Sequence, residues 1–263
     1  MSPKLLLASA ALLSALSAQA TVSVTSAAFT YSQSFDTLAT TGTANAWAND
    51  STLSGWSLFA AAPITSYSTG TGSNGSIAGF FSFGASGNGD RALGSVVTNA
   101  FAGPASTGTV YTVLALTNNS GNALNSFSLH YDGEQYRNNG NASAQSLVLQ
   151  YGFGASYAAV SSWTAAGTGF NFTSPVTGAS AAIVDGNAAG KVANLGGTVT
   201  TNWASGNTLW VRWADLNDAG NDHLLAIDNV KLSVTAAVPE PETYALLLAG
   251  LGVVSFVARR RRG

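Results

Sequence analysis

The sequence contains no cysteine and very few charged residues. Without cysteine, the chain can form no disulfide scaffold, thiolate nucleophile or Cys-ligated zinc site. Charged residues make up only 8% of the 263 residues, whereas an ordinary soluble domain has about 25%. Small and polar residues take their place, including 29 glycines. This composition lacks the charged coat of a cytosolic protein and is typical of an exported chain.

Positive charge is scarcer still in the central part of the chain. Four of the ten basic residues lie together at Arg259, Arg260, Arg261 and Arg262. Residues 21–238 hold five basic residues against ten acidic ones, a net charge of −5. No basic patch can therefore neutralise a phosphate backbone, and we predict no nucleic acid partner.

The first twenty residues have the pattern of a secretory signal peptide. Lys4 supplies a positive charge, an apolar run follows over residues 5–16, and Ala18 and Ala20 form a small-x-small site. Signal peptidase accepts such a site, so we predict cleavage after Ala20. The alternative is an N-terminal membrane anchor, but the run is shorter than the ~20 residues that a bilayer requires.

A second apolar run lies at residues 244–258 and is followed by the four arginines. As a helix it would span about 23 Å, less than the ~30 Å hydrocarbon core. We interpret it as a transmembrane helix that anchors the chain transiently in the inner membrane. The arginines should stay in the cytoplasm, which places everything before Tyr244 outside.

A proline-rich spacer, Val238, Pro239, Glu240 and Pro241, precedes that run. The two prolines fix φ and lack an N–H, so the spacer should be extended and accessible to proteases. Spacer, apolar helix and Arg cluster together resemble the PEP-CTERM sorting signal, here over residues 239–263. The resemblance implies processing by an exosortase in a Gram-negative bacterium that makes exopolysaccharide. A permanent single-pass anchor is the alternative.

Residues 21–238 have the pattern of one all-β domain. Short β-prone runs alternate with clusters of turn-forming residues, and no stretch has apolar residues at helical spacing. We predict an antiparallel β-sandwich of jelly-roll type. The expected strands cover residues 28–35, 55–59, 77–83, 110–116, 125–131, 146–153, 207–213 and 225–234.

Alternation within three of these strands predicts which side chains face the core. Phe127, Leu129 and Tyr131 share one face of their strand, and Leu209, Val211 and Trp213 share one face of theirs. In the last strand, strict alternation places Asp228 on the same face as Val230 and Leu232. A carboxylate in such an apolar layer needs a hydrogen bond, a cation or a metal. The run Leu-Ala-Ile-Asp-Asn-Val is similar to the closing strand of many secreted jelly-roll domains, including carbohydrate-binding ones.

The few charges of the domain gather in short segments, which favours pairing over general solvation. One hypothesis is a structural charge cluster in which Glu134 and Arg137 form buried salt links to Arg212 or Asp215. The cluster as a whole is Arg91, Glu134, Arg137, Arg212 and Asp228. The competing hypothesis is a polysaccharide hydrolase in which Glu134 works with Asp132 or Asp215 as an acid/base pair. Gly133 between Asp132 and Glu134 suggests a turn or bulge.

The loop from residue 215 to 222 is a candidate calcium site. It offers four oxygen-bearing side chains, Asp215, Asn217, Asp218 and Asp222, around Gly220. It departs from an EF-hand, because alanine stands at the fifth position and where the bidentate Glu should be. The alternative is an Asx-rich turn in which side chains accept hydrogen bonds from the loop backbone. A structural calcium ion is thus the one cofactor considered.

Aromatic residues allow a glycan-binding interpretation beside a structural one. The six tryptophans could form a sugar-stacking platform, with Trp210 and Arg212 on one strand face, or they could fill the core. The leading hypothesis is a non-enzymatic, exported protein of the cell surface or exopolysaccharide matrix that binds glycan. The alternatives are a surface polysaccharide hydrolase and a purely structural coat protein.

Overall fold

The computed structural model describes residues 21–73, 75–236, 246–251 and 259–260. The predicted signal peptide, the Pro-Glu-Pro spacer and most of the predicted membrane segment lie outside the described residues. Among the residues that are described, no helix is both long enough and apolar enough to cross a membrane. The membrane segment at residues 244–258 therefore stays a prediction.

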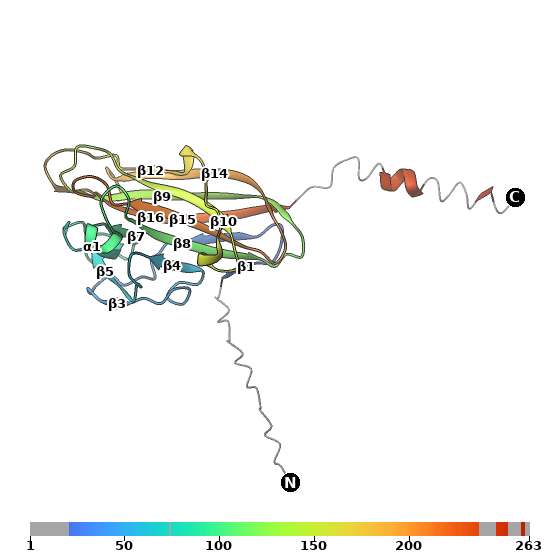
Figure 1. Ribbon diagram of the computed structural model, residues 1–263, viewed down its shortest axis with the longest axis horizontal. Helices are drawn as coiled ribbons and strands as arrows, with labels where there is room; N and C mark the ends of the chain where they lie inside the picture. Colours follow the sequence, from blue (N-terminus) through green and yellow to red (C-terminus); the bar gives the residue numbers. More distant parts are fainter. Residues whose placement is uncertain (1–20, 74, 237–245, 252–258, 261–263) are drawn as a thin grey trace, which may run out of the picture.

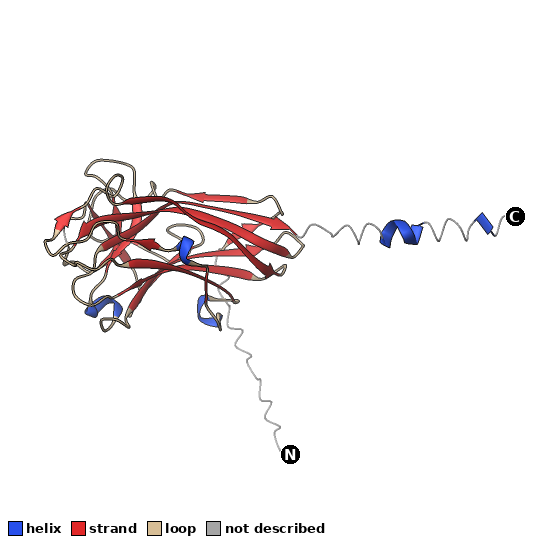
Figure 2. Cartoon of the chain, turned by 90° about the horizontal axis from the view of Figure 1, so that it is seen from above, coloured by secondary structure: helices blue, strands red, loops and turns tan. Residues whose placement is uncertain are grey.

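The described chain is almost entirely β-structure, and its long strands run along the length of the domain (Figure 1). Helical turns are short and lie at the periphery (Figure 2). The strands are β1 (Val22–Val24), β2 (Thr30–Gln33), β3 (Asn45–Ala46), β4 (Trp56–Phe59), β5 (Ser66–Gly70), β6 (Gly79–Phe83), β7 (Ala92–Val96), β8 (Thr109–Asn118), β9 (Leu124–Asn138), β10 (Ser146–Phe153), β11 (Thr164–Ala165), β12 (Phe172–Thr173), β13 (Ala182–Ile183), β14 (Lys191–Trp203), β15 (Thr208–Leu216) and β16 (Leu224–Ala236). The helical turns of the domain are α1 (Asn99–Ala102), η1 (Tyr157–Ala159) and η2 (Thr168–Phe170), and residues 246–251 and 259–260 near the C-terminus are also helical.

Two sheets form the β-sandwich that the sequence predicts. The seven-stranded sheet has the order β1-β8-β15-β10-β11, with β12 beside β10 and β4 beside β8. The nine-stranded sheet has the order β13-β9-β16-β7-β6-β5-β3, with β14 beside β9 and β2 beside β16. Most pairs are antiparallel, as predicted, but β1–β8 and β5–β6 are parallel.

Large aromatic side chains fill the space between the sheets. Trp56 and Trp213 stack with their ring centroids 5.7 Å apart, and Tyr131 meets Trp213 edge-on at 5.4 Å. The alternation predicted for β9 and β15 is confirmed, because Phe127, Leu129 and Tyr131 join Leu209, Val211 and Trp213 in this core. Burial of such rings supplies much of the free energy that stabilises a sandwich.

The nine-stranded sheet differs from the expected strands in two places. The strand β9 continues through Gly133 to Asn138, so Gly133 makes no turn. Its missing side chain leaves room for Phe172, whose ring would lie 2.3 Å from an added Cβ. The long strand β14 is absent from the sequence prediction, since Gly196 and Gly197 interrupt its alternating pattern.

Strict alternation in β16 is wrong at Asp228. A bulge shifts the register between Asp228 and Lys231, and Asn229 takes a positive φ of 51°. Leu225 and Ile227 before the bulge, and Val230 and Leu232 after it, all enter the core between the sheets. Asp228 consequently lies on the outer face of the nine-stranded sheet and not in the apolar layer.

Candidate functional site

The predicted structural charge cluster does not form as one unit. Arg91 is buried and donates from Nε to Ser82 Oγ at 2.8 Å. Arg137 donates to Asn139 Oδ1 at 2.9 Å and to the Gly72 carbonyl at 3.1 Å. Neither residue forms an ion pair with Glu134 or Asp228 among the described residues. The expected salt links of Glu134 and Arg137 to Arg212 or Asp215 are therefore wrong.

Arg212 lies instead on the outer face of the seven-stranded sheet. Its guanidinium stacks on the rings of Tyr111 and Trp163, at 4.3 and 3.8 Å from their centroids. Its Nε also donates to Gln150 Oε1 at 2.7 Å. Among the described residues Arg212 thus has no carboxylate partner, and cation–π contacts and hydrogen bonds to Gln150 and Tyr157 stabilise its charge instead.

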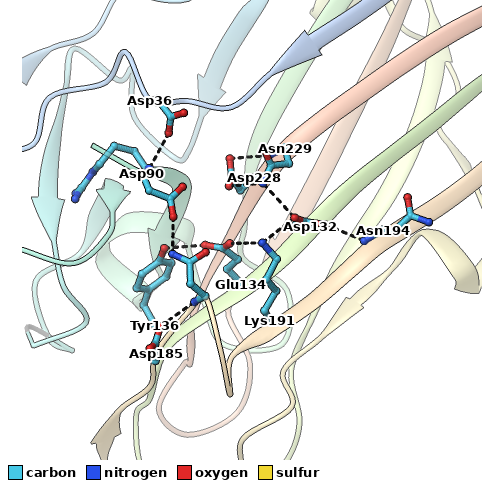
Figure 3. A network of polar contacts seen from close by, with 12 residues as sticks. Asp36, Asp90, Asp132, Glu134, Tyr136, Asp185, Lys191, Asn194, Asp228 and Asn229 are labelled. Carbon is cyan, nitrogen blue, oxygen red and sulfur yellow. Dashed lines mark hydrogen bonds and ion pairs between the residues drawn. The ribbon is translucent and has the colours of Figure 1, made fainter. Parts of the chain in front are cut away.

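The cation that meets the acidic residues of β9 is Lys191, at the start of β14 (Figure 3). Its Nζ lies 2.8 Å from Asp132 Oδ2 and 3.5 Å from Glu134 Oε1. The other oxygen of Glu134 accepts a hydrogen bond from the Tyr136 hydroxyl at 2.7 Å. Asn229 donates both to Asp132 and to Asp228, at 3.1 and 2.8 Å. This network joins β9, β14 and β16 on the outer face.

Burial decides the protonation of this carboxylate network. Glu134 and Asp228 are each only 1% exposed. Desolvation raises the pKa of Glu134 to about 7 and that of Asp228 to about 8, and repulsion from Glu134 contributes to the latter. Burial also acts to raise the pKa of Asp132, but the contacts with Lys191, Asn194 and Asn229 outweigh it and lower the pKa. Near pH 7, Asp228 therefore favours the neutral form and Glu134 is about half protonated.

This geometry gives the hydrolase hypothesis no support. Asp132 and Glu134 share one face, but the ammonium of Lys191 occupies the space between them. A glycosidase needs an open cleft between its two carboxyl groups. Asp215, the other candidate, is 5% exposed and accepts a short hydrogen bond from Ser95 Oγ. Burial raises the pKa of Asp215 well above its usual value.

Two of the four side chains of the candidate calcium loop, Asp215 and Asp222, accept hydrogen bonds from the protein itself. Asp222 Oδ1 accepts a hydrogen bond at 2.7 Å from the backbone N–H of Asp218, four residues earlier in the loop. The Asn217 amide donates to Asn99 Oδ1 at 2.7 Å and to the Gly103 carbonyl at 2.6 Å. Within the described part of the chain, no three His, Asp or Glu side chains are grouped so that they could hold a metal ion.

Most of the tryptophans are buried, and four of the six lie in the core between the sheets. Five of the six are buried, namely Trp47, Trp56, Trp203, Trp210 and Trp213. Trp210 donates from its indole N–H to the Gly154 carbonyl at 2.8 Å, on the outer face of the seven-stranded sheet. Trp163 is half-buried, and the Arg212 guanidinium lies over its ring.

A pocket of about 690 Å³ lies among the loops at one end of the sandwich. Three of these loops follow β5, β7 and β15, and the fourth wall is the end of β9. The pocket is lined by Ser73, Gly75, Ser76, Val97, Thr98, Asn99, Ala100, Arg137, Asn139, Asn217, Gly220, Asn221 and Asp222. Amide and hydroxyl groups dominate this loop-end pocket, with one guanidinium and one carboxylate.

Hydrogen bonds hold the walls of the loop-end pocket in place. Asn139 donates to the Gly75 carbonyl at 2.8 Å and accepts from Arg137, which ties the end of β9 to the loop after β5. Asn217 ties the loop after β15 to α1 through Asn99. Of the lining residues, only Arg137, Asn217, Gly220 and Asp222 were candidates from the sequence. The others, such as Asn139 and Asn99, belong to common Asn/Ser-rich turns and carry no distinguishing signal.

Comparison with known proteins adds one motif and a distant likeness. The PEP-CTERM protein-sorting motif matches residues 237–262. No curated protein matches the chain. Among solved structures, the CBM22-1 xylan-binding domain of Paenibacillus barcinonensis Xyn10C is similar at 10% identity and a TM-score of 0.40, over 82% of this chain and all of that one. The tandem CBM22-1-CBM22-2 domain of the same protein gives 11% identity and a TM-score of 0.41, over 82% and 48%.

A third structure is more distant. The isomalto-dextranase of Arthrobacter globiformis T6, complexed with panose, gives 12% identity and a TM-score of 0.29, over 79% of this chain and 33% of that one. Likenesses at these scores carry no inference about a ligand. The comparisons therefore establish the sorting motif and agree with the β-sandwich fold. The chain carries a PEP-CTERM sorting signal over residues 237–262, the exosortase substrate signal of a secreted or surface protein.

Proposed function

We propose that the sandwich is a non-catalytic glycan-binding domain, displayed at the cell surface or in the exopolysaccharide matrix. The observation that carries this proposal is the lining of the loop-end pocket. Four asparagines, two serines and a threonine offer both donors and acceptors at its wall. Sugar hydroxyls need such paired donors and acceptors, and a volume of about 690 Å³ falls in the usual range for small-molecule sites.

The carboxylates of the domain support binding without catalysis. Asp222 is the one carboxylate among the pocket residues. It is 6% exposed and accepts a hydrogen bond from the Asp218 backbone. Burial raises the pKa of Asp222 to about 7. One largely buried carboxyl without a second across the pocket offers no acid/base pair for cleaving a glycosidic bond.

Filling the pocket tests this function. Ala100 is exposed in α1 and lines the pocket, so Ala100→Trp should occupy it without removing a hydrogen bond. The ligand is the neutral oligosaccharide that binds the wild type best among xylo-, cello- and malto-oligosaccharides and fragments of the host exopolysaccharide. We expect the variant to bind it with at least tenfold lower affinity, as measured by isothermal titration calorimetry. The matched control is Ala158→Trp, an exposed alanine in η1 that does not line the pocket. Equal loss in both variants, or no binding by the wild type, would favour the structural coat protein.

Processing of the sorting signal gives a separate prediction. We expect the protein recovered from its native envelope to have lost residues 1–20 and the chain beyond the Pro-Glu-Pro segment, because exosortase removes the tail of its substrates. Intact-mass spectrometry measures this directly. The variant Pro239→Ala with Pro241→Ala should keep the tail. Recovery of Arg259 to Arg262 on the wild-type protein would instead indicate a permanent anchor.

A further inference from the structure

A regular array of hydroxyl groups covers part of the outer face of the nine-stranded sheet. Strand pairing places Thr30, Ser233, Ser128 and Thr198 side by side on β2, β16, β9 and β14. The next row towards one strand end holds Thr235, Ser126 and Thr200. The row on the other side holds Ser32, Lys231, His130 and Gly196. We call these three rows the hydroxyl face.

The side chains of the hydroxyl face point to solvent and are not part of the hydrophobic core. Its members are exposed or half-exposed, while the residues between them, such as Phe127, Leu129 and Leu232, are buried. Threonine is common in strands because of its β-branch, but serine is not among the strand-favoured residues. Four of the eight hydroxyls belong to serine. Strand propensity alone therefore does not account for the array.

The spacing of the rows follows from sheet geometry. Neighbouring strands lie about 4.8 Å apart, and residues on one face of a strand repeat every ~6.7 Å. The row that contains Ser128 and the row that contains Lys231 line a hollow of about 310 Å³. A second hollow of about 300 Å³ adjoins it at Ser32 and Lys231. An extended polar chain lying on this face would meet donors and acceptors at regular intervals.

Two nitrogen-bearing side chains give the face its charge preference. Lys231 is exposed and, within the described residues, forms no ion pair. It is a rare free cation, since residues 21–238 hold only five basic residues. His130 lies directly across from Lys231 in the sheet, is half-exposed and lines the same hollow. Both side chains can bind an acceptor that carries negative charge.

We propose that the hydroxyl face binds an extended acidic polysaccharide, with a sugar carboxylate at Lys231 and His130 and sugar hydroxyls along the serine and threonine rows. This site lies towards the opposite end of β9 from the loop-end pocket, because Ser126 and Ser128 are near the start of that strand and Arg137 is near its end. The two sites therefore bind independently, and the proposal goes beyond the pocket.

Binding to one polymer in two charge states tests the proposal. The purified full chain is passed over immobilised polygalacturonate and over its fully methyl-esterified form, which has the same backbone without the charge. We expect retention on the acid form, weakened at least tenfold by esterification or by a rise in salt from 50 to 500 mM. Lys231→Gln should lower the affinity at least fivefold, and Lys231→Arg should keep it. Lack of retention on the acid form, or equal retention on both, overturns the proposal.

Matched hydroxyl pairs test the role of the rows. Ser128 and Thr198 join their hydroxyls across β9 and β14, and Ser146 and Thr173 do the same across β10 and β12 of the other sheet. Ser128→Val with Thr198→Val should lower the affinity for polygalacturonate at least fivefold, while Ser146→Val with Thr173→Val should not change it. Equal effects of the two pairs contradict the proposal. Ala100→Trp should leave this binding unchanged, which separates the face from the pocket.

Discussion

The domain should be more stable at pH 5.5 than at pH 8.5, by about 5 kcal/mol or roughly 10–20 °C in melting temperature. The cause is the pair of buried carboxyls Glu134 and Asp228, whose pKa values are raised to about 7 and about 8. In the unfolded chain both titrate near pH 4. Between those values the folded state holds more protons than the unfolded state, so the free energy of unfolding falls as the pH rises.

Other titrating groups change this pH dependence of the unfolding free energy only in part. Burial also raises the pKa values of Asp215 and Asp222, which adds to the effect in the same direction. Burial lowers the pKa of His223, and this opposes the effect below about pH 6.5, because the unfolded chain binds a proton there first. The lowered pKa of Asp132 acts below pH 4, outside the window. The fall in stability should therefore be steepest between about pH 5.5 and 7, where the folded state keeps protons that the unfolded chain has lost, and should level off above about pH 8.

Isosteric amides identify the carboxyls that cause the effect. Glu134→Gln keeps an acceptor for the Tyr136 hydroxyl, and Asp228→Asn keeps one for the Asn229 backbone. Each variant removes an ionisation and should reduce the loss of melting temperature between pH 5.5 and 8.5 by about a third or more. Asp185→Asn is the control, since Asp185 lies in an exposed loop. A wild-type melting temperature that rises with pH over this range would contradict the assignment.

The sequence predicted which side chains form the core of the β-sandwich better than it predicted the contacts between polar side chains. Phe127, Leu129 and Tyr131 alternate strictly, and the structure places them in the core as expected. Alternation fails where the backbone departs from a regular strand. The bulge in β16 lies at Asn229, which has a positive φ. The only sequence signal for such a bulge is a residue type that tolerates a positive φ. Asparagine is such a residue, but it is too common in this chain to mark one position.

Charge pairing was the least predictable feature. Residues 21–238 hold five basic residues, and the hypothesis of salt links was based on the three arginines among them. The pairing depends instead on β14, which brings Lys191 opposite Glu134 in the sheet. That strand was not predicted, because its glycine pair breaks the pattern, so the partner of Glu134 could not be identified. The hydroxyl face was missed for the same reason, since Thr198 and Thr200 lie on β14.

Loss of Lys191 should destabilise the domain more than the loss of any other exposed or half-exposed cation. Lys191→Met removes the only ammonium that contacts Asp132 and Glu134 within the described residues. Breaking a fully buried pair costs 3–5 kcal/mol. Because the Lys191 side chain is 25% exposed, we expect about 2 kcal/mol at pH 8, measured by urea denaturation. Lys231→Met, which removes an exposed lysine without an ion pair, should cost less than about 0.5 kcal/mol.

The cost of Lys191→Met should also depend on the charge of Glu134. At pH 5.5 this carboxyl is largely protonated, since its pKa lies near 7. The uncompensated charge is then confined to Asp132, whose side chain is 16% exposed and keeps the hydrogen bonds from Asn194 and Asn229. The destabilisation should fall to about half of its value at pH 8, and a similar fraction should disappear when Lys191→Met is combined with Glu134→Gln. A cost that is the same at both pH values and in both backgrounds would show that the stem of Lys191 stabilises the sheet by packing alone, with no contribution from its charge.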